Sequence, residues 1–325
     1  MTITHRVLVS TDLGGDPDDI QSLYRLIHFS DILRVEGILS TTGPSSIPAA
    51  DRVRHWIQRV DVDAIRANGH KALMDEATLL GLVRQGATHP GAPTPERATE
   101  GSRWLIQRAL ADDPDGLGRP LWVLVWGSIT DVAQALHDAP EIAGRIRINS
   151  IGSSNTENDP ASRDWVYRFM AERYPALWWI EDGVMPKLSR DTFRGVYQAG
   201  DQSEGWSYGT FIPSHIRGKG TNHAGMFAER AGDAFPVADW PANSLKEGDS
   251  PTMLHLLGPA LDGVGDVDDP TSPGWGGRFG RPDPRYPNYY CDLDAPPEVC
   301  QETIGRWRRR FLETWLERWA WYPVV

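Results

Sequence analysis

The stretch of sequence that decides the fold is residues 7–19, VLVSTDLGGDPDD. It opens on the wholly apolar run Val7-Leu8-Val9, which is typical of a strand buried on both faces of a parallel sheet. Glycines and a proline predict a loop after it, and Asp18 or Asp19 supplies the carboxylate preferred where a helix begins. The order of strand, acidic loop and helix is that of an α/β sheet, whose ligands bind beyond the carboxyl ends of its strands.

Strands and helices continue to alternate through the first half of the chain. The sequence predicts further strands over residues 35–39, 121–125, 146–151 and 177–180. It predicts helices after Pro48 and over residues 96–110, 129–136 and 165–174. This alternation predicts the α/β class, with a mostly parallel, doubly wound sheet and helices on both faces. We expect one domain over residues 1–325.

The second half is rich in Gly, Pro and Trp, and its periodicity is weaker. Residues 181–241 are expected to form ordered loops, and residues 264–290 form a Pro/Gly-rich stretch too long for a plain connector. A short helix is expected over residues 252–257 and a C-terminal helix over residues 296–320. The apolar stripe of the last helix predicts either core packing or a subunit contact, so a homo-oligomer is one expectation.

Composition and charge exclude several classes of partner. The 325 residues hold 33 Lys and Arg against 44 Asp and Glu, a net charge of −11, which is opposite to the basic surface that nucleic acids require. No apolar run approaches the ~18 residues of a membrane span, and the first residues lead straight into a strand without a signal-peptide core. We therefore expect a cytoplasmic protein with no membrane partner, whose two cysteines, Cys291 and Cys300, are reduced.

The first loop concentrates negative charge. Asp12, Asp16, Asp18 and Asp19 place four carboxylates within eight residues. Such carboxylates repel one another, so either the loop is a solvated turn with a helix cap or a hard cation such as Ca²⁺ holds it. An aspartyl nucleophile of the phosphatase type is a third interpretation, but it lacks the second Asp, because Gly14 stands two residues after Asp12.

With residues 123–131, VLVWGSITD, the first loop resembles the nucleoside hydrolase fold. The sequence is more similar to the nucleoside hydrolase-like branch that includes cellulose-binding proteins of the Sde182 type. Residues 247–252, EGDSPT, and 274–279, GWGGRF, carry that likeness, which extends from residue 6 to about residue 279. The resemblance implies a nucleoside hydrolase-like α/β fold and hydrolysis of a glycosyl bond.

The resemblance also implies a ligand set for Ca²⁺. The ion would be held by the side chains of Asp12, Asp19 and Asp249 and by the backbone carbonyl of Trp126. Asp18 would correspond to a carboxylate that hydrogen-bonds sugar hydroxyls. In the implied reaction the cation acidifies a water, Asp12 takes its proton, and the water attacks an anomeric carbon. The implied ligand is a small sugar or glycoside with adjacent hydroxyls.

The chain departs from the family pattern in its first loop and at the position of the general acid. The loop is two residues longer than usual, and Ser10 stands where other nucleoside hydrolases have a further Asp. Gly248 stands where those that protonate a purine have a His, so purine nucleosides are expected to be poor substrates. The candidate replacements for this acid are His215, His223, His255 and Glu247.

The remaining substrate-binding predictions lie in loops. Asn155 follows a predicted strand in the region where the family supplies sugar-binding residues, although its surroundings are also typical of a polar turn. Trp275 and Arg278, between glycines, could stack on a sugar ring and hold its hydroxyls, or Trp275 could fill the core. Glu247 is the last residue predicted to bind substrate.

Two functions remain open from the sequence. The first is a calcium-dependent glycoside-type hydrolase acting on an N- or O-linked sugar other than a purine nucleoside. The second is a carbohydrate-binding protein on the same fold that breaks no bond.

Overall fold

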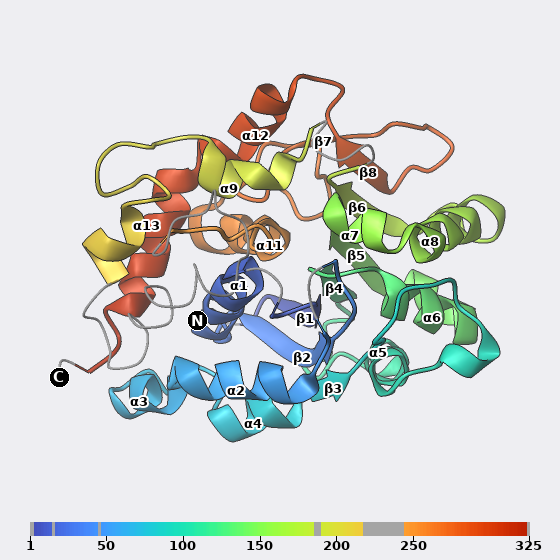
Figure 1. Ribbon diagram of the computed structural model, residues 1–325, viewed down its shortest axis with the longest axis horizontal. Coiled ribbons are helices and arrows are strands. Elements are labelled where there is room, and N and C mark those ends of the chain that lie inside the picture. The colour runs from blue at the N-terminus through green and yellow to red at the C-terminus, as the bar shows by residue number, and fades with distance from the viewer. Residues whose placement is uncertain (1–2, 15–16, 45–46, 185–189, 217–243, 324–325) are drawn as a thin grey trace.

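The computed structural model describes residues 3–14, 17–44, 47–184, 190–216 and 244–323, and its centre is one eight-stranded sheet (Figure 1). The strand order is β3-β2-β1-β4-β5-β6-β8-β7, and every neighbouring pair is parallel except β7 and β8. The strands are β1 (His5–Thr11), β2 (Leu33–Ser40), β3 (Val83–Gln85), β4 (Leu121–Val125), β5 (Ile146–Ile151), β6 (Trp178–Asp182), β7 (Phe279–Gly280) and β8 (Tyr289–Asp292).

Helices occupy most of the connections between strands. The α-helices of the described residues are α1 (Pro17–His28), α2 (Ala50–Val60), α3 (Val62–Ala67), α4 (Glu76–Gly81), α5 (Glu100–Leu110), α6 (Thr130–Asp138), α7 (Ser154–Asn158), α8 (Pro160–Glu172), α9 (Gly195–Gln198), α11 (Pro251–Asp262), α12 (Pro297–Gly305) and α13 (Arg308–Trp319). The short turns of other helix types are η1 (Pro95–Arg97), η2 (Pro140–Gly144), η3 (Thr192–Arg194) and the π-helical η4 (Ile212–Ile216).

The two faces of the sheet build two separate hydrophobic cores. Alternate residues of a strand point to opposite faces, so Val7 and Val9 pack with α1, α2, α11 and α13, whereas Leu8 packs with α5, α6 and α8. Figure 1 shows α11 and α13 on one side of the sheet and α6 and α8 on the other. The predicted doubly wound α/β fold is therefore confirmed.

The order of the strands reverses between β1 and β4. Strands β2 and β3 extend the sheet on one side of β1, and the chain then crosses back to add β4 on the other, with Ser10 opposite Val125. In doubly wound sheets the loops diverge at such a switch point and leave a crevice for a ligand. The loops that follow β1 and β4 carry Asp12 and Trp126 to this position.

The C-terminal region differs from the prediction of one helix over residues 296–320. It forms two helices, α12 and α13, which are separated at Arg306 and Trp307. Gly305, the last residue of α12, packs backbone to backbone against Gly200, and a Cβ atom at Gly305 would lie 2.6 Å from the Gly200 nitrogen. The apolar stripe of α13 is core: Trp315 is fully buried, and its indole donates a hydrogen bond to His28 Nδ1.

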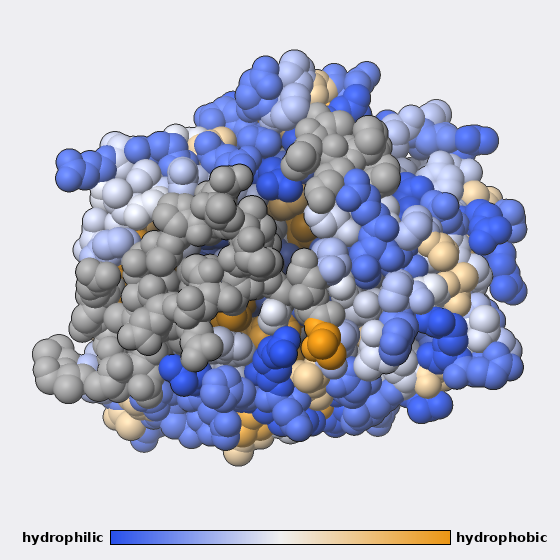
Figure 2. Space-filling model, in the orientation of Figure 1, coloured by the Kyte–Doolittle hydropathy of each residue, from blue (hydrophilic) through white to orange (hydrophobic). Residues whose placement is uncertain are grey.

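The surface agrees with the charged composition. Among the coloured residues of the face seen in Figure 2, hydrophilic ones predominate and apolar ones occupy a few small areas. Among the described helices, none has both the length and the apolar character needed to cross a membrane. Cys291 and Cys300 are buried and free.

Candidate functional site

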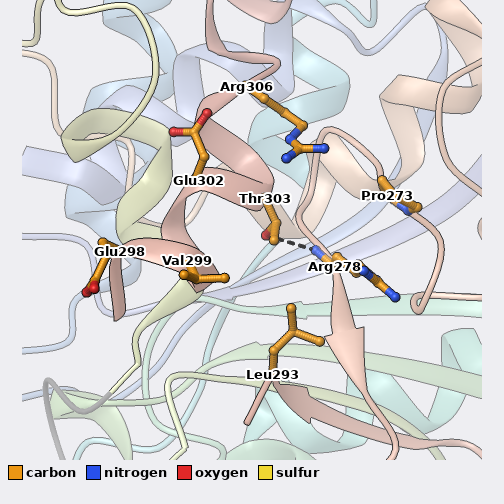
Figure 3. A pocket seen from close by; sticks show the side chains of 8 residues that line it. All are labelled: Pro273, Arg278, Leu293, Glu298, Val299, Glu302, Thr303 and Arg306. Atoms are coloured by element: carbon orange, nitrogen blue, oxygen red, sulfur yellow. Dashed lines mark hydrogen bonds between the residues drawn. The ribbon is translucent and has the colours of Figure 1, made fainter. Parts of the chain in front are cut away.

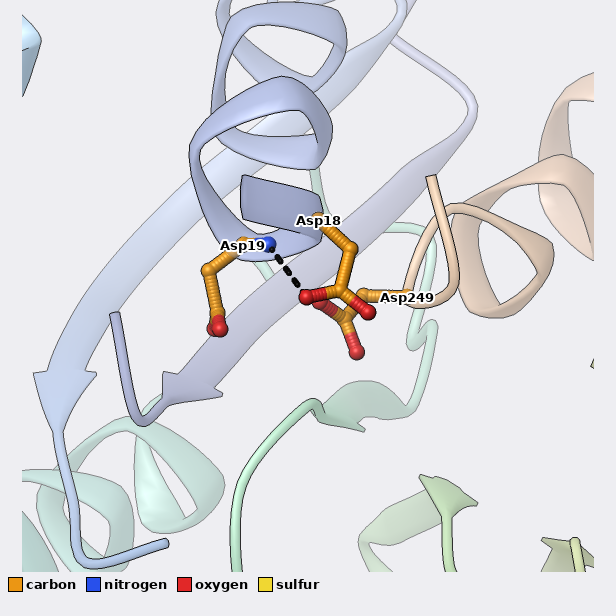
Figure 4. Close-up of side chains that lie close together, drawn as sticks. All are labelled: Asp18, Asp19 and Asp249. Carbon is orange, nitrogen blue, oxygen red and sulfur yellow. Dashed lines mark hydrogen bonds between the residues drawn. The ribbon is translucent and has the colours of Figure 1, made fainter. Parts of the chain in front are cut away.

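Three carboxylates converge beyond the carboxyl end of β1 (Figure 4). Asp18 and Asp19 lie in the first turn of α1, where the helix dipole favours negative charge, and Asp249 lies in the segment that leads into α11. One oxygen atom from each carboxylate lies within 4.8 Å of the others. The fold thus brings an N-terminal pair of carboxylates to a single late one, at the switch point of the sheet.

Asp19 is the most enclosed member of this group. Its side chain is 2% exposed, and Thr11 donates a hydroxyl hydrogen bond to its carboxylate. Burial raises the pKa of Asp19 well above its usual value, and the charges of Asp12 and then Asp18 raise it further. Because the site crowds negative charge in a buried place, it favours either a proton or a cation among these side chains.

Asp12 lies beside Asp19 because two glycines leave room for it. A Cβ atom at Gly43 would lie 1.5 Å from Asp12 Oδ2, and one at Gly127 would lie 3.0 Å from the Asp12 Cβ. The Asp12 side chain is 7% exposed. It is therefore packed between the loops that follow β2 and β4. Asp16, the other acid of the first loop, lies outside the described residues.

Trp126 joins the end of β4 to the segment of Asp249. Its carbonyl accepts a hydrogen bond of 2.7 Å from Asn155 Nδ2, which also donates to the Ile151 carbonyl. Its indole donates to Thr252 Oγ1 at 2.8 Å, and that hydroxyl donates to the Asp249 carbonyl at 2.8 Å. Asn155, predicted to bind sugar, thus uses its amide nitrogen to orient the carbonyl that was predicted as a metal ligand.

Two neighbours of Asp18 were not assigned roles at this site from the sequence. Lys246 Nζ lies 4.0 Å from Asp18 Oδ2, on a side chain that is 10% exposed. A Cβ atom at Gly248 would lie 2.6 Å from the same oxygen, so any side chain at this position displaces Asp18. The sequence showed Gly248 only as a missing acid, whereas the structure shows that it also makes space for Asp18.

His255 does not reach the carboxylates. Its ring packs against Trp122 and Trp178, which begin or nearly begin β4 and β6 and so lie toward the amino edge of the sheet. Burial lowers its pKa to about 4, so it is neutral near pH 7. His255 thus lies at the opposite edge of the sheet from the three carboxylates, too far to protonate a leaving group bound there.

The other candidate acids have different positions. Glu247 is fully buried in an ion pair with Arg25, which occupies both of its carboxylate oxygens. His215 packs in η4 against Trp206 and Phe211. His223 lies outside the described residues.

Trp275 and Arg278 are not brought to the carboxylates. Trp275 is 1% exposed and packs in the core against Gly258 and Phe311, so the stacking surface expected from its loop is covered. Arg278 is exposed and donates through Nε to the Thr271 carbonyl. It lines a separate cavity of about 340 Å³ at α12, which Figure 3 shows.

The donors at the switch point suit a hard cation. Carboxylate and backbone carbonyl oxygens are the ligands that Ca²⁺ prefers, and it takes six to eight of them. Asp18, Asp19 and Asp249 already converge within the span of one ion. A divalent charge would also relieve the repulsion that, after burial, raises the pKa of Asp19. The residues present therefore fit Ca²⁺.

A family model described as "Cellulose-binding Sde182, nucleoside hydrolase-like domain" matches residues 6–279. The chain is similar to the structure of a nucleoside hydrolase-related hypothetical protein from Saccharophagus degradans that is associated with carbohydrate metabolism. The two are 23% identical with a TM-score of 0.69, over 99% of this chain and 72% of that one. No curated protein matches the chain.

Two nucleoside hydrolase structures are also similar. A purine-preferring ribonucleoside hydrolase from Gardnerella vaginalis is 15% identical with a TM-score of 0.51, over 97% of this chain and 98% of that chain. An inosine-guanosine nucleoside hydrolase is 12% identical with a TM-score of 0.51, over 98% and 100%. At these identities the likeness shows a shared fold.

Proposed function

We propose that this chain, which belongs to the cellulose-binding Sde182 nucleoside hydrolase-like family, is a calcium-dependent hydrolase of glycosyl bonds. The observation that carries the proposal is the convergence of Asp18, Asp19 and Asp249 within 4.8 Å at the switch point of the sheet. The proposed substrates are N- or O-linked sugars other than purine nucleosides.

The proposed calcium ligands come from three loops. Asp12 belongs to the first loop and Asp19 to the helix after it, the Trp126 carbonyl lies directly after β4, and Asp249 precedes α11. Asp18 is close enough to share the ion, since its oxygen lies in the same group. When bound, calcium supplies Lewis acidity and open coordination positions that suit a pair of adjacent hydroxyls.

Asp12 is the proposed general base. Its carboxylate, enclosed by Gly43 and Gly127, is fixed next to Asp19, so it can hold the proton of an attacking water at one oxygen atom. The water would attack the anomeric carbon, which has oxocarbenium character, as the bond from this carbon to the leaving group breaks and the leaving group departs as a weakly basic anion. Removing this base without changing its shape, as in Asp12→Asn, should abolish turnover while the fold is kept.

Asp18 and Lys246 are the proposed contacts for sugar hydroxyls. Asp18 is 14% exposed in its side chain, more than Asp19 and Asp249, so it is the carboxylate that a ligand can reach most readily. A carboxylate accepts strong, charge-assisted hydrogen bonds from hydroxyls. The ammonium group of Lys246 stands close to Asp18 and limits the repulsion between the carboxylates.

The substrate prediction follows from Gly248. A purine leaves readily only when it is protonated, and general acid catalysis contributes ~10²–10⁴-fold. We expect kcat/KM for p-nitrophenyl riboside to exceed that for inosine by about this factor, with p-nitrophenyl glucoside as the comparison for sugar specificity. Turnover should disappear with a chelator and in Asp12→Asn. Equal rates on inosine and the activated riboside would contradict the proposal.

A carbohydrate-binding protein without catalysis is the second candidate. The absence of a side chain at Gly248 and the family's description as cellulose-binding both favour it. Calorimetric titration with riboside, glucoside and cello-oligosaccharides separates the two functions. Calcium-dependent sugar binding with no turnover of any glycoside would support the binding protein and exclude the hydrolase.

A further inference from the structure

Helix α1 binds the segment that carries Asp249 through its own side chains. Gln21 donates through Nε2 to the Ser244 carbonyl at 3.0 Å, and its Oε1 accepts from the backbone nitrogen of Lys246 at 2.6 Å. The hydroxyls of Ser22 and Ser250 are 2.9 Å apart. These contacts lie in the turn of α1 that follows Asp18 and Asp19. The helix that provides two carboxylates therefore also holds the backbone that provides the third.

A buried ion pair completes this connection one turn further along α1. Arg25 Nε lies 2.5 Å from Glu247 Oε1, and its Nη2 donates to Oε2 at 2.7 Å, in a bidentate arrangement. The side chains of Arg25 and Glu247 are 1% and 0% exposed. Two parallel hydrogen bonds fix the relative orientation of the groups as well as their distance.

The surroundings of the pair hold both partners in place. Arg25 Nη1 donates to the Phe311 carbonyl at 3.2 Å, and the guanidinium lies 4.2 Å from the centre of the Trp315 ring. Glu247 Oε1 also accepts from Ser250 Oγ at 2.9 Å. The pair is thus anchored to α13 on one side and to the start of α11 on the other.

The net contribution of such a pair to stability is small. Burying two charges costs nearly as much as their attraction returns, and apolar replacements of similar volume are often neutral or stabilising. What the pair does supply is geometry, because Glu247 is two residues before Asp249 and Arg25 is on the helix of Asp18 and Asp19. A shift at either end changes the distance between the late carboxylate and the early pair.

We propose that Arg25 and Glu247 are positioning residues for the cation site, holding Asp249 at the distance from Asp18 and Asp19 that calcium binding requires. The inference rests on the proposed function, because calcium affinity is the property that the pair sets. It replaces the substrate-binding role predicted for Glu247, because this carboxylate is fully buried and Arg25 occupies both of its oxygen atoms.

The test compares calcium affinity by calorimetry and melting temperature in chelator for the full chain and its variants. The double variant Arg25→Met with Glu247→Met removes both charges and leaves neither unpaired. Its calcium affinity should fall by ~10–100-fold, as when partners of metal ligands are lost, while its melting temperature in chelator stays near that of the parent. Arg25→Lys keeps the charge but not the bidentate geometry, and should give a smaller loss.

The matched control is another buried pair, Arg318 with Asp31, whose Nη1 and Oδ2 atoms are 2.7 Å apart and whose side chains are 3% and 6% exposed. It joins α13 to the turn after α1, away from residues 244–250. The double variant Arg318→Met with Asp31→Leu should leave calcium affinity unchanged. Unchanged affinity in both Arg25→Met/Glu247→Met and Arg25→Lys would overturn the positioning role alone. A parent chain that binds no calcium would overturn the proposed function, and this inference with it.

Discussion

Two groups of buried aspartates lie at the carboxyl edge of the sheet, and they are stabilised in different ways. The β6–β8 group consists of Asp182, Asp191 and Asp292. Asp292 accepts hydrogen bonds from the backbone nitrogens of residues 183, 184 and 192, and Asp182 accepts one from residue 193. Asp191 pairs with Arg194 at 2.9 Å. Local backbone donors therefore hold Asp292, and a guanidinium holds Asp191. Burial and then the charge of Asp292 raise the pKa of Asp182 well above its usual value, so this carboxyl group favours the protonated form.

The switch-point group consists of Asp12, Asp18, Asp19 and Asp249. In the described part of the chain, it alone has three carboxylate oxygens within 4.8 Å of one another. Its compensating contacts include the Thr11 hydroxyl on Asp19 and Lys246 at 4.0 Å from Asp18. Acids at one edge of the sheet thus serve two purposes. Where backbone N–H groups donate to them they fix a loop, and where their oxygen atoms converge they suit a cation.

The largest effect that tests this comparison is stabilisation by calcium. A ligand present at 1,000 times its Kd stabilises the folded state by about 4 kcal/mol. We expect calcium to raise the melting temperature by several degrees over chelator, since each kcal/mol shifts it by ~2–4 °C in proteins of ~150–250 residues. Asp249→Asn should remove this response. A melting temperature that is the same in millimolar calcium and in chelator would contradict the cation assignment of the switch-point group.

The second largest effect concerns the β6–β8 group, and we expect it to be independent of calcium. Asp292→Asn keeps the shape of the side chain but replaces one carboxylate oxygen with an NH₂ group. In the parent, backbone N–H groups donate to both oxygens, so at least one of these donors loses its acceptor in the variant. Hydrogen bonds to a charged group contribute ~1.5–3 kcal/mol each. We therefore expect the free energy of unfolding, measured in urea, to fall by about 3 kcal/mol. The same loss in calcium and in chelator is the expected signature. A loss confined to calcium-containing buffer would mean that this group also binds the ion.

The sequence predicted the parts of the fold that are coded by long apolar runs. β4 and β5 have the predicted limits. β4 is buried on both faces and is a continuous apolar run, whereas β5 carries isoleucines at residues 146, 148 and 151 between polar residues. The missed strands, β3, β7 and β8, have two to four residues, too few for a periodicity to be visible. β7 lies within the Pro/Gly-rich stretch of residues 264–290, and β8 begins at its end; the place of β8 is set by pairing with β6.

The candidate site could be proposed from the sequence only where it is local or where the family resemblance supplied it. Asp18 and Asp19 follow from a helix start, and Asp249 from its motif. The contacts of Arg25 with Glu247 and of Asn155 with Trp126 join distant residues and leave no pattern in the sequence. Trp275 and Arg278 share a loop, but one side chain packs in the core and the other lies at the surface, a difference that sequence spacing does not code.

A smaller effect is expected at Gly248. Alanine at this position would place a Cβ atom 2.6 Å from Asp18 Oδ2, so Asp18 must move away from Asp19 and Asp249. We expect Gly248→Ala to weaken calcium binding about tenfold, or about 1.4 kcal/mol, by calorimetry. Gly81→Ala is the control, since no atom lies within 4 Å of its added Cβ. Affinity that is equal in Gly248→Ala and the parent would show that Asp18 does not share the ion.

The smallest effect is expected when a charge is removed from the β6–β8 group and calcium affinity is measured. Asp191 adopts φ of 37°, a left-handed conformation that Asn also tolerates, so Asp191→Asn changes the charge with little cost to the backbone. Because Arg194 already compensates the Asp191 carboxylate, its field at the switch-point group is small. Calcium affinity should change by less than about twofold, or about 0.4 kcal/mol. A fivefold change would mean that the two groups act as one electrostatic unit, and that the division between backbone-compensated and cation-binding acids is wrong.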